Sequence, residues 1–190
     1  MTLRQFFAAA TMLICLPLTT ALGARKTWSL SSPDGRIVTE ISAGNGLRYS
    51  VTRDGVRLLD PSEISMTFED GAVFGGTDKV RGIKKGSNDV RGIPAMNYKK
   101  AAVDDVYNFL TLEFKGYNAE FRAFDDGVAY RFVSTAKSGE FTVTDELTEF
   151  NFAEDWTAWV PYVSGSEEKT IEQQFVNSFE NTYEIGRAHV

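Results

Sequence analysis

One stretch of alternating residues, 117–132, constrains the fold more than any other part of this sequence. The side chains that share one face are Tyr117, Ala119, Phe121 and Ala123 on the incoming arm and Val128, Tyr130 and Phe132 on the return arm. Between the arms stands Asp126-Gly127, a pair that supplies the positive φ angles of a tight hairpin turn. A period of two is that of an extended strand, so the segment predicts a β-hairpin with one aromatic-rich face buried.

Similar short segments follow one another along most of the chain. They cover residues 36–42, 47–52, 56–59, 64–68, 107–114 and 140–143, and turn signals such as Asp54-Gly55 separate them. Residues 75–100 are rich in Gly, Lys, Arg and Asn, and we expect loops there around one or two weak strands. No segment after the first two dozen residues sustains helical spacing beyond two turns. The pattern therefore predicts an all-β fold, an antiparallel β-sandwich.

The first 23 residues have the features of a signal peptide. Arg4 precedes an apolar run over residues 6–18, and the small residues around Ala21 and Gly23 suit signal peptidase. The run is too short for a comfortable membrane span, so we expect no membrane association after cleavage. Cys15 lies inside this segment, and the mature chain has no cysteine. These features predict an exported bacterial protein of the periplasm or cell surface.

The other end of the chain looks foreign to the domain. Residues 185–190 read as the in-frame translation of a common sequencing adapter, so we assign the folded domain to residues 24–184 and expect it to be truncated. His189, the only histidine, falls in that segment and is given no chemistry. The net charge of −6 argues against nucleic acid and anionic membranes as partners.

Catalytic motifs are missing from the sequence. A serine or cysteine hydrolase needs a base, and no histidine precedes residue 189. Trp156, Trp159 and Tyr162 stand within seven residues of one another, and they either fill a core or line a sugar site, because pyranose rings pack well on aromatic side chains. On local sequence alone Glu180 is a surface carboxylate.

Several motifs, in order, resemble the N-terminal domain of glycoside hydrolase family 97. They are the Ser-Pro-Asp-Gly turn at 32–35, the Leu-x-Tyr-x-Val strand at 47–51, the Phe-Asp-Asp-Gly hairpin at 124–127, the Trp-x-Pro segment at 159–161 and the Glu-x-x-Tyr of Glu180 and Tyr183. The resemblance covers residues 28–183. It implies a β-super-sandwich, incomplete at its C-terminal end, that packs on a (β/α)8 barrel carrying the catalytic residues.

The resemblance also implies an activity and a metal for the parent protein. Family members are α-glucosidases or α-galactosidases, so the implied substrate is an α-linked oligosaccharide. Glu180 matches the glutamate with which this domain helps to ligate calcium near the scissile bond, and carboxylate oxygens are ligands that calcium prefers. Trp156 and Trp159 become candidates for substrate binding. Because the barrel is absent, we expect the fragment alone to be inactive.

The sequence leaves two sugar-related hypotheses open, beside a third, a structural or interaction sandwich with no sugar contact. In the first, the chain is the supporting sandwich of an exported α-glycosidase and supplies one calcium ligand, Glu180. In the second, it is a stand-alone carbohydrate-binding sandwich in which Trp156, Trp159 and Tyr162 form an exposed platform. Sugar binding that is lost on Trp159→Ala would favour the second.

Overall fold

The structure is a computed structural model that describes residues 25–93, 101–137, 139–161 and 183–187. Every regular element in these ranges is a β-strand. The strands are β1 Lys26–Ser31, β2 Ile37–Ala43, β3 Leu47–Arg53, β4 Val56–Phe68, β5 Val73–Phe74, β6 Gly82–Gly92, β7 Val103–Glu113, β8 Tyr117–Phe124, β9 Gly127–Ser134, β10 Val143–Thr148, β11 Thr157–Pro161 and β12 Tyr183–Arg187. The all-β prediction is confirmed.

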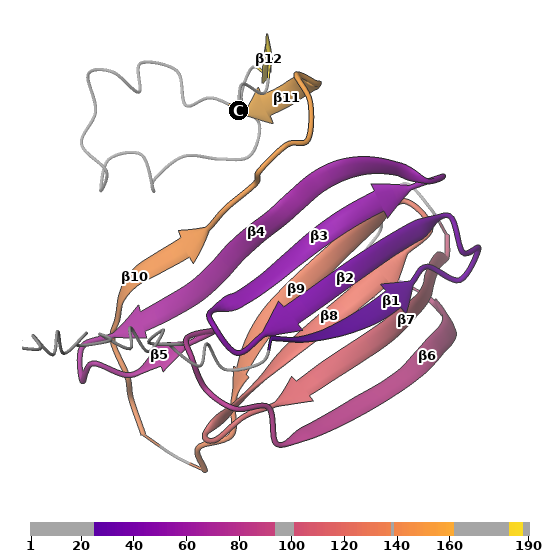
Figure 1. The fold of residues 1–190 in the computed structure, drawn as a ribbon. Helices are drawn as coiled ribbons and strands as arrows, with labels where there is room; N and C mark the ends of the chain where they lie inside the picture. The colour runs from indigo at the N-terminus through magenta and orange to yellow at the C-terminus, as the bar shows by residue number, and fades with distance from the viewer. Residues whose placement is uncertain (1–24, 94–100, 138, 162–182, 188–190) are drawn as a thin grey trace, which may run out of the picture.

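The strands form two packed antiparallel sheets and one separate ribbon (Figure 1). Sheet A has the order β1-β2-β3-β4-β10, with the short β5 also paired to β4. Sheet B has the order β6-β7-β8-β9, and strands β1 and β2 of sheet A contact β7 and β8 of sheet B. Strand β11 pairs with β12. The predicted antiparallel β-sandwich is therefore present.

The core lies between the sheets and follows the predicted alternation. Tyr117, Ala119, Phe121 and Ala123 are all at most 2% exposed. From sheet A the buried partners include Ile41, Leu47, Tyr49, Val51 and Ile64. The Tyr117 ring is stacked between Phe74 and Phe114, with ring centroids 4.2 and 4.6 Å away. This aromatic stack joins β5 to sheet B, because Phe74 belongs to β5.

The Asp-Gly pairs at 54–55 and 126–127 behave differently in their hairpins. Asp54 and Gly55 have φ angles of 50° and 82°, as a tight turn of the predicted kind requires. In the β8–β9 hairpin the strands close instead on the pair Phe124 and Gly127, so the two turn residues are Asp125 and Asp126. Gly127 is the first residue of β9 and has no positive φ. The predicted hairpin is confirmed, but its predicted turn at Asp126-Gly127 is wrong by one residue.

Four predicted segments differ from the observed strands. The segments 56–59 and 64–68 are parts of one strand, β4, which continues through a bulged register against β3. The segment 75–100, expected to be loops around one or two weak strands, contains β6, an 11-residue strand paired with β7 along its whole length. The strand expected at 140–143 lies further along, as β10. Strand β6 is an edge strand, where glycine and lysine are tolerated because backbone pairing does not depend on their side chains.

Candidate functional site

The candidate site residues from the sequence lie at the C-terminal end of the chain. Trp156 directly precedes β11 and is partly buried, and its Nε1 is buried without a hydrogen-bond partner in the described part of the chain. Trp159 lies in β11, where its backbone pairs with Ile185 of β12, and its side chain is outside the described set. Glu180 and Tyr162 lie outside the described residues. Their roles in sugar and calcium binding stay predictions.

The strand β12 crosses the boundary at which the sequence suggested a foreign segment. It runs from Tyr183 to Arg187, so the strand includes residues 185–187, which were expected to lie outside the folded domain. A strand requires only backbone pairing, and Arg187 is paired with Thr157 of β11. The origin of residues 185–190 therefore stays a prediction.

A polar clamp holds the segment that leads to Trp156. The Glu149 carboxylate accepts hydrogen bonds from the Glu63 backbone N–H at 2.8 Å and from Asn151 Nδ2 at 3.1 Å. The buried Ser62 hydroxyl accepts the Asn151 N–H at 2.9 Å and donates to the Asp60 carbonyl at 2.8 Å. These bonds satisfy polar groups that pairing between strands leaves open, and they fix the segment against β4. No sequence motif predicted this clamp.

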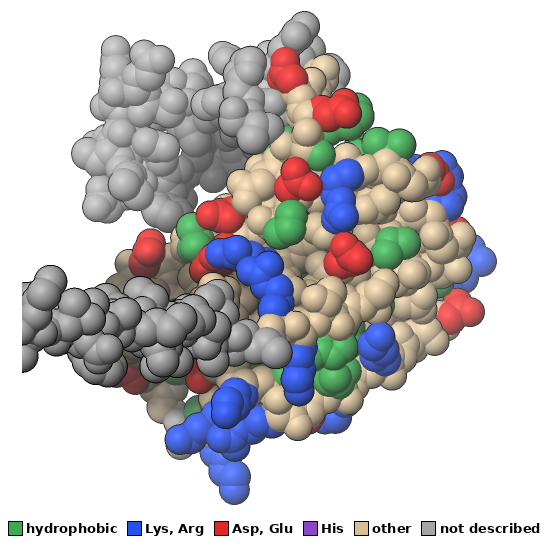
Figure 2. All heavy atoms as spheres, viewed as in Figure 1, with side chains coloured by type: hydrophobic (Ala, Val, Ile, Leu, Met, Phe, Trp, Pro, Cys, Tyr) green, Lys and Arg blue, Asp and Glu red, His purple; other side chains and the backbone are tan. Residues whose placement is uncertain are grey.

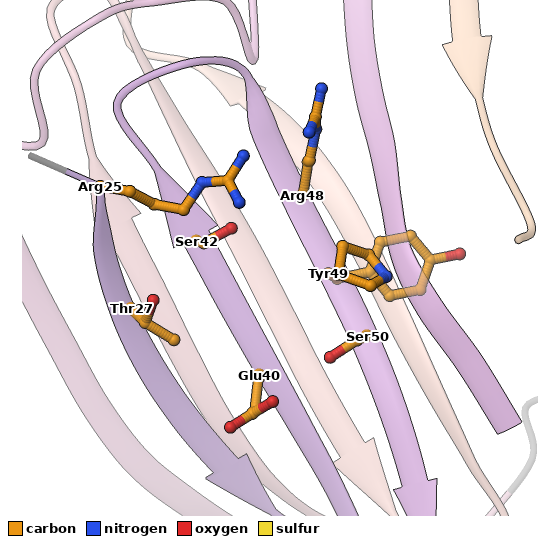
Figure 3. Close-up of a pocket in the computed structure, with 8 residues that line it drawn as sticks. Arg25, Thr27, Glu40, Ser42, Arg48, Tyr49 and Ser50 are labelled. Carbon is orange, nitrogen blue, oxygen red and sulfur yellow. The ribbon is translucent and has the colours of Figure 1, made fainter. Parts of the chain in front are cut away.

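A small hollow opens on the outer face of sheet A (Figure 3). Its volume is about 130 Å³, and its lining residues are Arg25, Thr27, Glu40, Ser42, Arg48, Tyr49, Ser50 and Pro61. Arg48 is paired with Glu63, with its Nη2 2.5 Å from the carboxylate, and the Ser50 hydroxyl accepts a hydrogen bond from Arg57 at 2.5 Å. Small-molecule sites usually enclose about 300–1,000 Å³. The hollow is therefore smaller than a usual ligand site, and Arg48 and Ser50 in its lining are already paired.

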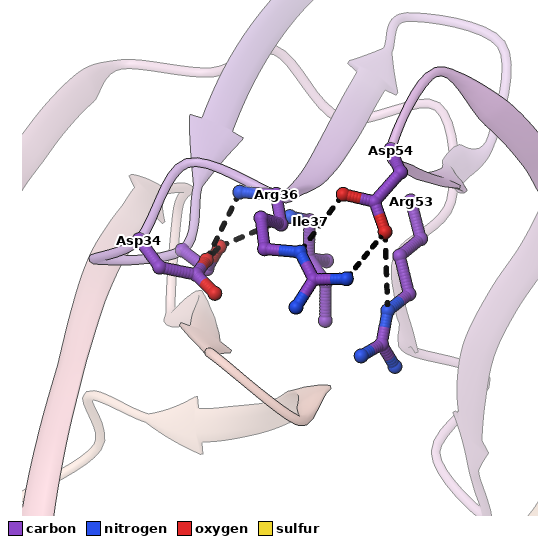
Figure 4. A network of polar contacts seen from close by, with 6 residues as sticks. Asp34, Arg36, Ile37, Arg53 and Asp54 are labelled. Carbon is purple, nitrogen blue, oxygen red and sulfur yellow. Dashed lines mark hydrogen bonds and ion pairs between the residues drawn. The ribbon is translucent and has the colours of Figure 1, made fainter.

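Charged turns meet at one end of the sandwich (Figure 4). The Arg36 guanidinium donates two hydrogen bonds to the Asp54 carboxylate, at 2.9 and 2.7 Å, and these bonds lower the pKa of Asp54 and raise that of Arg36. Asp34 accepts hydrogen bonds from the Ser32 hydroxyl and the Arg36 N–H, which lower its pKa. The Asp34 N–H donates to Asp125 at 2.9 Å and so links the two sheets. Because the Asp34 and Asp54 carboxylates are bonded within these turns, we interpret this end of the sandwich as stabilising the fold.

The described residues contain no candidate metal centre. No group of three or more His, Cys, Asp or Glu side chains that suits a metal ion occurs among them. Burial raises the pKa values of Tyr49 and Tyr117 to about 12, so both phenols stay protonated at neutral pH. Figure 2 shows acidic and basic side chains on the same face of the molecule. No helix in the described ranges is long and apolar enough to cross a membrane.

Comparison with known proteins identifies the family of this domain. The sequence model of the family described as "Glycosyl-hydrolase 97 N-terminal" matches residues 30–189. The chain is 43% identical over 173 residues to a "Retaining alpha-galactosidase" of Bacteroides thetaiotaomicron, covering 90% of this chain and 26% of the relative. It is 30% identical over 149 residues to a "Probable retaining alpha-galactosidase" of Streptomyces bingchenggensis, covering 70% and 22%.

Solved structures show the same fold. A glycoside hydrolase family 97 enzyme from a Pseudoalteromonas species, in complex with panose, has a TM-score of 0.61 and 26% identity, over 71% of this chain and 22% of that enzyme. A β-arabinopyranosidase, at 24% identity and a TM-score of 0.62, supports the fold alone. The chain spans about a quarter of the length of the curated relatives it matches.

Proposed function

This chain belongs to glycoside hydrolase family 97 as an N-terminal domain of such a glycosidase, and from that premise we propose that its parent protein is an exported bacterial α-glycosidase. The sandwich supports a catalytic domain that lies outside this chain. The proposal is supported by the family match over residues 30–189 and by the share of the relatives that the chain leaves uncovered, roughly three-quarters. Export rests on the signal-peptide features of residues 1–23, and a mature protein starting near Ala24 in the periplasmic fraction is the expected result.

We further propose that the parent enzyme hydrolyses α-galactosides with retention of configuration. The 43% identity to the retaining α-galactosidase carries this proposal, because it is well above the 26% identity to the enzyme bound to panose. Retention requires a carboxylate nucleophile close to the general acid, and both would come from the catalytic domain. The chain described here supplies neither.

The substrate proposal is tested with the product of the uninterrupted parent gene. Hydrolysis of p-nitrophenyl α-galactoside and p-nitrophenyl α-glucoside is compared as kcat/KM, and the first-formed anomer is followed by NMR. We expect preference for the galactoside and initial release of the α-anomer. Preference for the glucoside, or initial release of the β-anomer, would contradict the proposal. The 190-residue chain is the control and should hydrolyse neither substrate.

Calcium ligation by Glu180 is a further part of the proposal. Its support is the Glu-x-x-Tyr context of Glu180 and Tyr183, which matches the family motif, and the carboxylate chemistry that calcium prefers. With calcium bound, the ion would stand near the substrate. Glu180 would hold one side of that site from the sandwich and so couple the two domains.

The calcium assignment is tested in the parent enzyme by Glu180→Gln, which keeps the shape of the side chain and removes its charge. We expect weaker calcium affinity and activity that depends on added calcium. Tyr183→Phe is the matched control, because a phenol three residues away is a poor calcium ligand, and it should change calcium affinity much less. Unchanged calcium affinity and turnover in the glutamine variant would return Glu180 to an ordinary surface carboxylate.

A further inference from the structure

A second hollow lies between the start of sheet A and the connection from β5 to β6. Its volume is about 380 Å³, which falls in the range of small-molecule sites, about 300–1,000 Å³. Its lining includes Lys26 and Trp28 from β1, Ala43 at the end of β2, and Thr77, Asp78 and Lys79 from the connection. It is larger than the polar hollow of sheet A and has a different lining.

The floor of this hollow is apolar and contains an indole. Trp28 and Val80 are partly buried and pack against the hydrophobic core, and Ala43 is buried. The Trp28 indole has neither a hydrogen-bond partner nor a ring contact in the described part of the chain. Its Nε1 is not one of the buried polar atoms that lack a partner, so it is accessible to solvent. A partly exposed indole whose Nε1 has no partner offers a stacking surface with a donor at its edge.

The rim combines donors and acceptors of both signs. Lys26 and Lys79 are exposed, and neither ammonium has an ion-pair partner in the described ranges. The Asp78 carboxylate accepts only one long hydrogen bond within the described residues, from the Tyr117 hydroxyl at 3.4 Å. Thr77 adds a hydroxyl at the same rim. A rim of one sign would suit an ion, whereas a mixed rim suits vicinal hydroxyls, each of which both donates and accepts.

The connection that forms the outer wall is held at both ends. At its start, the Gly75 carbonyl accepts the Leu47 N–H at 2.7 Å, and the Gly75 N–H donates to the Tyr117 hydroxyl at 2.9 Å. At its end, the Arg81 N–H donates to the Glu113 carbonyl at 2.7 Å. A wall fixed in this way lowers the entropic cost of binding.

We propose that this hollow is a carbohydrate-binding site that takes one neutral pyranose ring, stacked on the Trp28 indole. The ring hydroxyls accept from the ammonium groups of Lys26 and Lys79 and donate to the Asp78 carboxylate. The site lies in the sandwich itself, so it neither supplies nor needs the catalytic residues of the parent enzyme. The inference does not depend on the proposed substrate or on calcium.

The test is a calorimetric titration of the full 190-residue chain with methyl α-D-galactopyranoside and, separately, methyl α-D-glucopyranoside. We expect saturable millimolar binding of at least one of them. Asp78→Asn and Lys79→Ala, both at exposed positions, should each weaken binding by about 2- to 10-fold, as expected for the loss of one hydrogen bond. Trp28→Ala should abolish it. Lys115→Ala, an exposed lysine outside the hollow, is the matched control and should bind as the unaltered chain does.

Because Trp28 also packs against the core, the two rim variants decide the outcome even if Trp28→Ala fails to fold. No binding of either sugar by the unaltered chain overturns the proposal. Binding that neither Asp78→Asn nor Lys79→Ala weakens also overturns it. Binding that Trp156→Phe abolishes overturns it too, because the sugar would then lie at the C-terminal tryptophans. A failed search for glycosidase activity in the parent protein would leave this result untouched.

Discussion

Gly75 provides a sharp test of how sheet A is joined to sheet B. It has a φ of 83°, and a Cβ placed on it would collide with the Ile64 carbonyl oxygen and come within 3.1 Å of the Phe132 ring. Its backbone groups are engaged on both sides, with the Leu47 N–H and with the Tyr117 hydroxyl. The substitution Gly75→Ala therefore cannot be absorbed by a flexible side chain. The backbone must move, and the two hydrogen bonds must lengthen.

The loss in the free energy of unfolding has two separable contributions. A left-handed φ disfavours alanine by about 1–2 kcal/mol, and an overpacked buried position adds about 1–3 kcal/mol. Gly116→Ala isolates the first contribution, because Gly116 has a similar φ of 89° but no atom within 4 Å of the position that a Cβ would take. We expect the free energy of unfolding to fall by about 1–2 kcal/mol for Gly116→Ala and by about 2–5 kcal/mol for Gly75→Ala.

Urea unfolding followed by tryptophan fluorescence measures both variants beside the unaltered chain. With a slope of about 2 kcal/mol per molar urea, a difference of about 2 kcal/mol between the variants separates their midpoints by about 1 M. Equal losses for the two variants would refute the reasoning. They would mean that the joint between Gly75 and Ile64 is looser than the structure describes and that backbone angle alone sets the cost.

Two further predictions concern buried aromatic groups. Burial raises the pKa values of Tyr49 and Tyr117 from 10.0 to about 12. The stability that they contribute should be fully present below about pH 10 and lost as the pH rises toward about 12. Urea unfolding across this pH range measures the loss, and in Tyr49→Phe the free energy of unfolding should fall less steeply with pH. Trp156→Phe removes a buried N–H that has no partner in the described residues, so the gain should offset the lost packing and leave unfolding within about 1 kcal/mol of the unaltered chain.

The sequence predicted those parts of the fold that depend on local patterns. Alternation at Tyr117 and Phe121 identified the buried face of β8, and Asp54-Gly55 marked a turn with two positive φ angles. The β8–β9 turn was misplaced because two aspartates precede Gly127, and strand pairing, not the Asp-Gly pair, decides where the loop closes. One or two weak strands were expected within residues 75–100, and the length of β6 was underestimated because an edge strand is stabilised by backbone pairing with β7, which leaves little trace in its side chains.

The candidate sites depend on tertiary structure more than the strands and turns do. The hollow at Trp28 was not predicted, because β1 and the connection around Asp78 are about fifty residues apart and meet only in the folded sandwich. A lone tryptophan in a short strand is typical of a core residue. The assignment of Glu180 came from resemblance to the family and not from local sequence, and Glu180 lies outside the described residues.

Reading the parent gene across the codons for Tyr183 and Arg187 tests the central claim most directly. The account predicts an uninterrupted frame that continues for roughly three times the length matched here, with the alternating strand and helix pattern of a (β/α)8 barrel, and that departs from this sequence within residues 185–190. A natural stop codon near Tyr183 would contradict it. The sandwich would then be a complete protein, and its aromatic surfaces would have to account for its function alone.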